Sequence, residues 1–376
     1  MKILYVGSPQ LFTEGASGIH VGRMCEALSD LGHDTTLMLP IEEEEIGGFF
    51  SFYGVKDNFL IKATPGFKKS SMRHFFHGII SFLKFLFSKD YDLVLTRNIT
   101  FALLASFIKS RIIVDIHHPP VNFLSKIATK RFLKCENIVR VSCNSVGTMD
   151  SIVKIFSHNE KLKVFHNGVN LESFVPNDNL DNLVSKLNIP DKCNIVSYIG
   201  NTYRGRGIEK IIELSKKHKE IFFLVVGGEE EDNSYYLKSV DSTQSNILFT
   251  GHVPHQEIPN YLCLSDILLI PYDSDFTIKG GSLANDYSSP IKLFEYLSAG
   301  KPIVASNLSS FNEILKDGMN SILVNPDSIN EISESIEKLL NDKALRDNLS
   351  SNSLELSKRF TWINRAKGMI SLWKTT

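Results

Sequence analysis

Residues 288–305 combine a potential anion site with the signals that begin and end a helix. Ser289 suits the N-cap, Pro290 suits the first helical position, and Gly300 suits the end of the helix before Pro302 opens the next strand. The sequence therefore predicts a helix whose exposed start presents free N–H groups, which can hold a phosphate.

Two charged residues follow on this predicted helix. Lys292, one turn in, would add a positive charge beside a bound phosphate. Glu295 lies three residues further along the same face, where its carboxylate could accept two hydrogen bonds from a ribose diol. An ordinary pair of surface charges on a capped helix explains the same two residues, and the pattern alone leaves both interpretations open.

Short β-branched runs alternate with helical patterns along the chain, which is typical of βαβ units and a parallel sheet. We expect strands at 3–6, 35–39, 93–95, 112–116 and 138–141, and then at 195–199, 222–226, 247–249, 267–271, 303–305 and 322–324. This α/β pattern predicts two Rossmann-like domains, 1–170 and 171–355, with a turn signal at Asn167-Gly168. His117 and His118 follow the strand at 112–116, at the end where parallel sheets build their sites.

Composition narrows the functional class. A chain of 376 residues suits two domains, and 41 Lys and Arg against 42 Asp and Glu argue against nucleic-acid binding. The five cysteines include no Cys-x-x-Cys pair, which argues against a zinc ribbon or a disulfide framework and favours a reduced, cytoplasmic protein. No apolar run reaches the roughly 20 residues that cross a bilayer.

The stretch 58–89 has an unusual composition, with six Lys or Arg, seven Phe and no Asp or Glu. His77, Ser81, Lys84 and Ser88 fall on one stripe at helical spacing, while Phe and Leu cover the rest. This pattern describes a helix packed on a sheet as well as a helix lying on a membrane, and both interpretations stay open. We expect the loop 66–71 to face water.

Several segments, in the same order, resemble the retaining glycosyltransferases of family 4. The stretch 290–296 is similar to the Pro-x-Lys-Leu-Phe-Glu-Tyr signature of one branch of that family. Further similarities cover its interdomain segment, donor-phosphate loop, nucleotide-side strands and the start of its last helix, at 164–170, 196–209, 249–272 and 360–362. The resemblance extends over nearly the whole chain.

This resemblance implies the GT-B fold, in which two Rossmann-like βαβ domains face each other across a cleft. The first domain would take the acceptor and the second the nucleotide-sugar, and a C-terminal helix at 356–376 would cross back to the first domain. The implied enzyme is a hexosyltransferase-class protein that moves a sugar from a nucleotide diphosphate-sugar to a hydroxyl acceptor with retained anomeric configuration. It would use no metal and no cofactor, since the nucleotide-sugar is a substrate.

The resemblance also implies roles for individual residues. Arg206, Arg204 and Lys292 would stabilise charge on the leaving diphosphate, and His117 would orient the donor sugar. The implied catalytic residues are His117, Arg206 and Lys292. The backbone near 251–253 would contact the base, and the loop 15–18, before a helix starting near Ile19, would approach the donor. The implied donor-binding positions are Gly18, Arg204, Val253, Ser289, Pro290 and Glu295.

Two positions depart from the family pattern. Tyr287 stands where many members have the first of two glutamates, although Asp286 is adjacent and could substitute for it. Asn201 replaces a frequent Arg, although the nearby arginines keep positive charge available. These departures leave open a non-catalytic subunit that binds a sugar-nucleotide or a partner. The architecture also leaves open a phosphorylase or epimerase of similar fold.

Other ligand classes fit the sequence poorly. Asp273-Ser274-Asp275 predicts a solvated loop rather than a metal site, and His252 and His255 lack metal-ligand spacing. The glycine spacing near the N-terminus does not match a dinucleotide-binding fingerprint. The composition of the basic, aromatic stretch 58–89 favours a saccharide or lipid-linked acceptor of the cell envelope. If this stretch is the helix that lies on a membrane, we expect the contact to be with the inner membrane surface.

Overall fold

The computed structural model describes residues 1–13, 15–65, 72–88, 90–174, 180–241, 243–277 and 283–371. The chain divides into two compact units: unit 1 comprises Met1–Asn167 and Trp362–Thr376, and unit 2 comprises Gly168–Thr361. The loop 66–71 and the Gly280-Gly281 pair lie outside the described residues. The division at Asn167 falls at the Asn-Gly turn signal.

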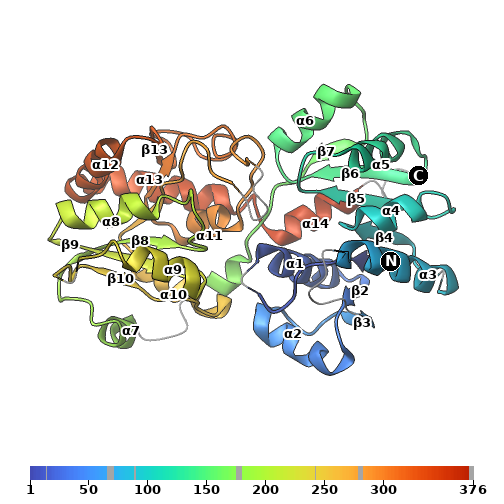
Figure 1. Cartoon of the computed structure of the whole chain (residues 1–376), viewed down its shortest axis with the longest axis horizontal. Coiled ribbons are helices and arrows are strands. Elements are labelled where there is room, and N and C mark those ends of the chain that lie inside the picture. Colours follow the sequence, from blue (N-terminus) through green and yellow to red (C-terminus); the bar gives the residue numbers. More distant parts are fainter. Residues whose placement is uncertain are drawn as a thin grey trace. The chain divides into compact units, whose positions relative to one another are not determined.

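Within the described residues, unit 1 contains a seven-stranded parallel sheet in the order β3-β2-β1-β4-β5-β6-β7 (Figure 1). Every strand expected in this half of the chain is present, whereas β3 and β7 were not predicted. The strands are β1 (Lys2–Val6), β2 (Asp34–Pro40), β3 (Leu60–Thr64), β4 (Leu93–Thr96), β5 (Ile112–Ile116), β6 (Ile138–Cys143) and β7 (Leu162–Val164).

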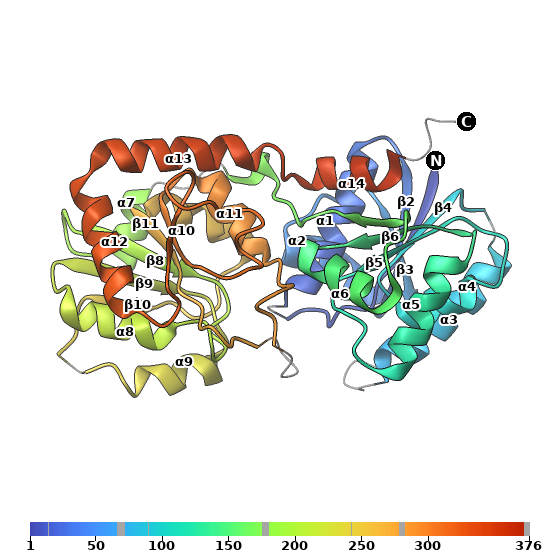
Figure 2. The same ribbon diagram turned by 90° about the horizontal axis from the view of Figure 1, so that it is seen from above.

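Helices cover both faces of this sheet, because the strand order runs in opposite directions from β1 and right-handed crossovers then lie on opposite faces. Figure 2 shows α1 and α14 on one side of the strands and α3, α4 and α5 on the other. Because α14 packs against α1, the C-terminal helix returns to unit 1, as the GT-B resemblance implies. The helices are α1 (Ala16–Asp30), α2 (Ile46–Tyr53), α3 (Arg73–Phe87), α4 (Ile99–Ala105), α5 (Phe123–Lys134), α6 (Val146–Phe156) and α14 (Trp362–Ile370), with a 3-10 turn η1 (Glu43–Glu45) before α2.

Helix α3 lies in the basic, aromatic stretch, and it is oriented unlike an ordinary amphipathic helix. Its polar residues His77 and Ser81 are buried, and His77 Nδ1 lies 2.7 Å from Thr64 Oγ1 of β3. By contrast, Phe75, Leu83 and Phe87 are 48%, 49% and 90% exposed. The helix therefore packs on the sheet partly through its polar stripe, which leaves large apolar side chains outside.

Unit 2 contains, within the described residues, a six-stranded parallel sheet in the order β10-β9-β8-β11-β12-β13. All six strands were predicted, and they are β8 (Asn194–Ile199), β9 (Ile221–Val226), β10 (Ile247–Phe249), β11 (Ile267–Ile270), β12 (Ile303–Ser306) and β13 (Ile322–Val324). The helices are α7 (Leu180–Lys186), α8 (Ile208–Lys217), α9 (Glu230–Leu237), α10 (Ile258–Leu264), α11 (Ile291–Ala299), α12 (Ile329–Asn341) and α13 (Lys343–Ser357), with 3-10 turns η2 (Leu171–Phe174) and η3 (His255–Glu257).

Each unit has its own apolar core, built from the inward side chains of its sheet and the helices on it. The five cysteines are free thiols. None of the helices in the described part of the chain is long and apolar enough to cross a membrane.

Candidate functional site

The carboxyl end of β8 is shaped by glycines and by a tyrosine of α11. Gly200 has φ +139°, and a Cβ there would overlap the Lys292 ammonium group. Gly207 has φ +75° at the start of α8, where a Cβ would overlap the carbonyl oxygen of Pro271. Tyr296 accepts a hydrogen bond from the Ile199 N–H at 2.7 Å. These contacts hold α11 and the glycine loop against each other.

Two buried cations lie beside Tyr272 at this end of the sheet. The Lys292 ammonium lies 3.9 Å from the centre of the Tyr198 ring and 5.4 Å from that of Tyr272. The Arg206 guanidinium lies 4.4 Å from the Tyr272 ring centre. The buried Lys292 Nζ has no hydrogen-bond partner among the described residues. Neither cation forms an ion pair with a carboxylate of these residues. The cluster therefore carries positive charge that forms no direct ion pair within the described residues.

The electrostatics of this cluster follow from its burial. Burial lowers the pKa of Lys292 to about 8, although the neighbouring Tyr272 phenol favours the charged form, and the positive charge of Arg206 lowers it further. Burial would raise the pKa of Tyr272, but the charges of Arg206 and Lys292 outweigh it, so that the pKa of this phenol is lowered. An anion that enters the cluster would supply the missing counter-charge.

Glu295 does not form a surface pair with Lys292. Its Oε1 lies 2.7 Å from His255 Nε2, and both side chains are largely buried, at 10% and 17% exposure. His255 sits in η3, before α10. The sequence pointed to His255 only as a possible metal ligand and gave no signal for this contact, which links residues forty positions apart.

The predicted start of α11 is wrong by one residue. Pro290 has extended backbone angles, φ −69° and ψ 136°, and is itself the N-cap, so helical geometry begins at Ile291. Ser289 therefore lies outside the cap position that it was predicted to fill, and no side chain caps this helix end. The predicted end is confirmed, because Gly300 closes the helix in the left-handed region with φ +60°.

The remaining donor-side positions of unit 2 make contacts of their own. Arg204 is exposed, and its guanidinium lies 4.8 Å from the centre of the Tyr235 ring. Val253 is buried and follows Gly251, whose carbonyl oxygen accepts a hydrogen bond from the Gly227 N–H at 2.9 Å. This bond joins the ends of β9 and β10.

Gly18 lies in unit 1, inside α1, because that helix begins at Ala16 and not near Ile19. A Cβ at Gly18 would overlap the ring and hydroxyl of Tyr53. The close packing of α1 on α2 thus accounts for the glycine, and the expectation of a loop at this position is wrong.

Tyr287, which departs from the family pattern, and the two aspartates considered with it in the sequence, Asp286 and Asp273, have local partners. Tyr287 is half-buried and packs against the core of unit 2. Asp286 accepts a hydrogen bond from the Ser309 hydroxyl at 2.6 Å. Asp273, the first residue of the Asp-x-Asp sequence, forms an ion pair with Lys210 at 2.5 Å. Each carboxylate is thus engaged by a neighbouring side chain.

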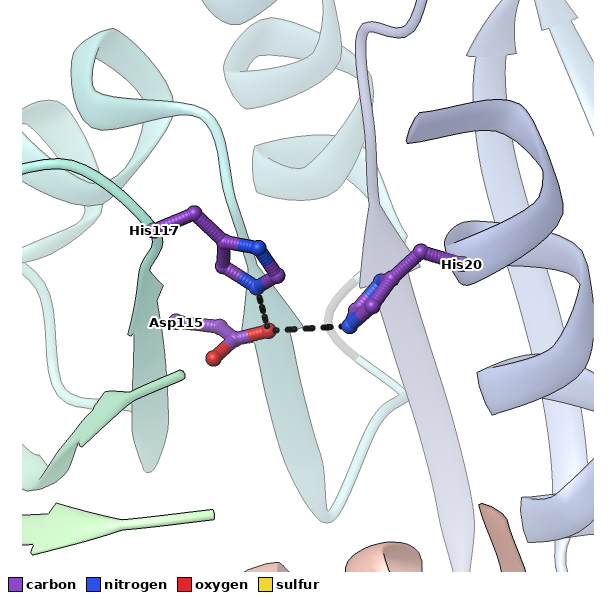
Figure 3. Close-up of side chains that lie close together, drawn as sticks. All are labelled: His20, Asp115 and His117. Carbon is purple, nitrogen blue, oxygen red and sulfur yellow. Dashed lines mark hydrogen bonds and ion pairs between the residues drawn. The ribbon is translucent and has the colours of Figure 1, made fainter. Parts of the chain in front are cut away.

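Unit 1 contains a different buried cluster, centred on Asp115 at the end of β5 (Figure 3). His117 Nε2 lies 2.9 Å from Asp115 Oδ2, and His20 Nε2 of α1 lies 3.7 Å from the same oxygen. Arg365 of α14 donates through Nη2 to both carboxylate oxygens, at 2.8 and 2.9 Å. The ring of Trp362 stacks edge-on against His20 at 5.2 Å. The sequence pointed to His117 but gave no signal for Asp115 or Arg365 as its neighbours.

Protonation in this cluster is set by burial and by the ion pair. Burial raises the pKa of Asp115, but the charge of Arg365 and the contact with His117 outweigh it and hold this pKa well below its usual range. Burial, together with the charge of Arg97, lowers the pKa of His117 to about 3, against the opposing effect of Asp115. His117 is therefore neutral at pH 7. With Nε2–H donating to the carboxylate, its Nδ1 lone pair is left to accept a hydrogen bond.

His20, Asp115 and His117 form the one group of potential ligands in the described residues that is compact enough for a metal ion. The donor set does not suit one, however. Both Asp115 oxygens already accept hydrogen bonds from the Arg365 guanidinium, whose positive charge would repel a divalent cation. The group is a buried ion-pair network rather than a ligand set.

Comparison with known proteins gives the family. Residues 17–173 match the model of "Glycosyltransferase Family 4", and residues 180–355 match that of "Glycosyl transferases group 1". The chain belongs to the family 4 type of GT-B glycosyltransferases. The expected fold of two parallel-sheet α/β domains is confirmed by solved glycosyltransferases of that architecture.

Individual relatives of this glycosyltransferase are distant. It is 26% identical over 309 residues to an uncharacterized glycosyltransferase of Methanocaldococcus jannaschii, a match to 75% of this chain and 74% of that protein. The HepE protein of Anabaena, solved with UDP and glucose, superposes with a TM-score of 0.75 at 15% identity over the full length of both chains. WaaG, described as involved in lipopolysaccharide biosynthesis, gives a TM-score of 0.68 at 13% identity, again over both full chains.

Proposed function

We propose that this glycosyltransferase moves a sugar from a nucleotide diphosphate-sugar to a hydroxyl acceptor with retention of anomeric configuration. The observation that carries the proposal is the pair of buried cations Arg206 and Lys292, which form no ion pair with a carboxylate of the described residues. A buried charge without a partner is costly, so a protein retains it where a ligand supplies the counter-charge. A diphosphate carries the charge and the oxygens that an Arg–Lys pair binds well.

In the proposed reaction these cations act on the leaving group. As the glycosidic bond to the diphosphate breaks, negative charge grows on the phosphate oxygens, and fixed cations in a buried site stabilise it without reorganising. No metal is needed in this scheme, because Arg206 and Lys292 take that role. Glu295, held by His255, would accept the ribose hydroxyls, and the Nδ1 lone pair of His117 would accept a hydrogen bond from a donor-sugar hydroxyl.

The nucleotide and the acceptor are proposed from the relatives. The Anabaena protein binds UDP and glucose, which makes a uridine diphosphate donor the first to test. WaaG is described as acting in lipopolysaccharide biosynthesis, which favours a cell-envelope saccharide, free or lipid-linked, as the acceptor. The basic, aromatic surface of unit 1 supports an acceptor that is held at a membrane.

The proposal is tested by measuring the melting temperature with UDP, GDP, ADP and CMP, in EDTA and in Mg²⁺. A ligand that binds only the folded state stabilises it by about 2.7 kcal/mol at a hundredfold excess over Kd. We expect one diphosphate to stabilise the wild type in EDTA, and the Lys292→Met variant to lose this response. Stabilisation by no nucleotide, or only with Mg²⁺, would contradict the proposed diphosphate site.

Tyr287, in the place of a frequent glutamate, favours one competing function: a subunit that binds a sugar-nucleotide without turnover. A transferase assay with native lipid extract separates the two. Transfer of labelled sugar, with the anomer identified by NMR, supports the enzyme. Diphosphate binding without transfer, hydrolysis or epimerisation supports the binding subunit.

A further inference from the structure

The first turns of α5 and the residues before it expose a group of large apolar side chains. Val121, Phe123, Leu124 and Ile127 are 74%, 76%, 76% and 46% exposed. Their apolar area faces solvent although α5 buries its opposite side, including Ala128 and Phe132, against the core of unit 1. An apolar cluster of this kind on a surface helix marks a contact site.

The charge of the same region is strongly one-sided. From Arg73 to Cys135 the sequence has ten Lys and Arg residues but three acidic residues, one of which is the buried, ion-paired Asp115. The helices α3, α4 and α5 contain no Asp or Glu at all. Helix α5 also exposes three lysines, one within the apolar group and two after it in the sequence: Lys126, Lys130 and Lys134. The whole chain, by contrast, has a net charge of −1.

The apolar and basic side chains belong to one continuous layer. Helix α3 packs against α4 and α4 against α5, and both views show the three helices side by side on the same side of the sheet (Figures 1 and 2). This layer adds Phe75, Leu83 and Phe87 of α3 to the apolar group of α5. Phe107, two residues beyond α4, is 69% exposed and has the Arg131 guanidinium of α5 3.5 Å from its ring centre.

We propose that the α3–α4–α5 layer, led by the N-terminal end of α5, docks on a membrane surface of anionic lipid. Exposed aromatic and aliphatic side chains enter the boundary between headgroups and acyl chains, while the lysines meet the negative surface potential. A second copy of the chain fits worse as the occupant, because a twofold contact would set the basic layers against each other. Val121 follows His117 by only four positions, so the docking surface begins next to the proposed donor-sugar contact of unit 1.

Docking is tested with vesicles, independently of the transfer reaction. The purified protein is sedimented with vesicles of neutral phosphatidylcholine and with vesicles that also contain 30% phosphatidylglycerol, at low and high salt. We expect binding to the anionic vesicles that weakens as salt rises. The variant Leu124→Ser/Lys126→Glu should lower the partition coefficient at least tenfold, because it removes one inserted side chain and reverses one surface charge.

A matched control comes from α9 and its C-cap in unit 2. Leu237→Ser/Lys238→Glu makes the same chemical changes at an exposed leucine and an exposed lysine, and should leave vesicle binding unchanged. Equal losses in both variants, or no vesicle binding by the wild type, would overturn the proposal. So would a wild-type dimer that the α5 variant alone converts to a monomer, because the layer would then cover a second copy. Circular dichroism confirms that each variant is folded.

Discussion

The two units bury charge in opposite ways. In unit 1, Asp115 meets Arg365, and two neutral histidines stand beside the pair, so the cluster is internally balanced. In unit 2, Arg206 and Lys292 face aromatic rings and have no carboxylate partner among the described residues. A balanced buried cluster holds its own elements in place, whereas an unbalanced one is completed by a ligand. A mutation of Asp115 in unit 1 should therefore lower stability. A mutation of Lys292 in unit 2 should instead lower ligand affinity and leave stability level or raise it.

The largest effect on stability is expected at Asp115. Replacing it with Asn leaves the buried Arg365 guanidinium without its counter-charge, which costs about 3–5 kcal/mol of unfolding free energy. Urea unfolding measures the loss. In a double-mutant cycle, Asp115→Asn combined with Arg365→Met should cost less than the sum of the single variants, because the second change removes the stranded charge.

Lys292 provides the contrasting variant. Lys292→Met removes a buried cation that has no described carboxylate partner, so the unfolding free energy should stay level or rise. A loss of several kcal/mol at Lys292 would show that its charge is balanced after all, and the comparison of the two clusters would fail.

The next largest effect is on catalysis, at Arg206. Arg206→Ala should lower kcat/KM about 10²–10³-fold, because the guanidinium stabilises charge that develops only as the diphosphate leaves. Arg204, exposed over Tyr235, is the matched arginine, and Arg204→Ala should cost much less. Steady-state kinetics, with the donor identified by thermal shift, measure kcat/KM for both variants. Equal losses at both arginines would contradict the special position of Arg206.

The sequence predicted most of the fold because strands and crossover helices are local signals. All eleven strands expected from β-branched runs are present. The short β7, Leu162–Val164, was missed, and β3, Leu60–Thr64, was hidden within a stretch that stands out for its Phe and Lys content. The start of α11 was wrong because Pro290 fits either the N-cap or the first helical position, and only its ψ of 136° distinguishes them.

The site was less accessible to sequence than the fold. Lys292 and Glu295 could be picked out by residue type, but their true neighbours, Tyr198 and His255, come from other strands and turns. The sequence did not show which side of α3 packs on the sheet. His77 lies on that buried side, where its ring contacts Thr64 of β3. Likewise, the exposed apolar group of α5 became visible only when side-chain exposure was known.

A smaller effect, on the pH dependence of stability, is expected from unit 1. Burial lowers the pKa of His20 well below its usual range, of His77 and His117 to about 3, and of His166 to about 4. Between the unfolded pKa near 6.5 and these values the unfolded chain binds more protons than the folded one. Stability is therefore lost as pH falls, by about 2.7 kcal/mol between pH 7 and 6 for the four together.

Hydrogen exchange of unit 1 peptides measured from pH 7 to pH 5.5, after correction for the intrinsic rate, reports this loss. Replacing His20 with Gln should reduce the slope, because one of the four protons is then no longer taken up on unfolding. A slope that His20→Gln leaves unchanged would show that its ring is already protonated in the folded state.

The smallest effect, about tenfold per pH unit, is expected at Lys292 in alkaline solution. Its lowered pKa of about 8 means that the free protein loses this charge above that pH, so affinity for a diphosphate should fall from there. Stability of the free protein should move the other way and rise between about pH 8 and 10.5, because only the unfolded chain still holds the proton. Titration calorimetry between pH 7 and 9.5 measures the affinity. Lys292→Arg is the control, because its side chain stays charged over this range and any pH dependence that remains comes from the nucleotide itself. Identical pH profiles for the wild type and Lys292→Arg would mean that the Lys292 charge plays no part in holding the diphosphate, and Arg206 would then be the only cation of the pair that binds it.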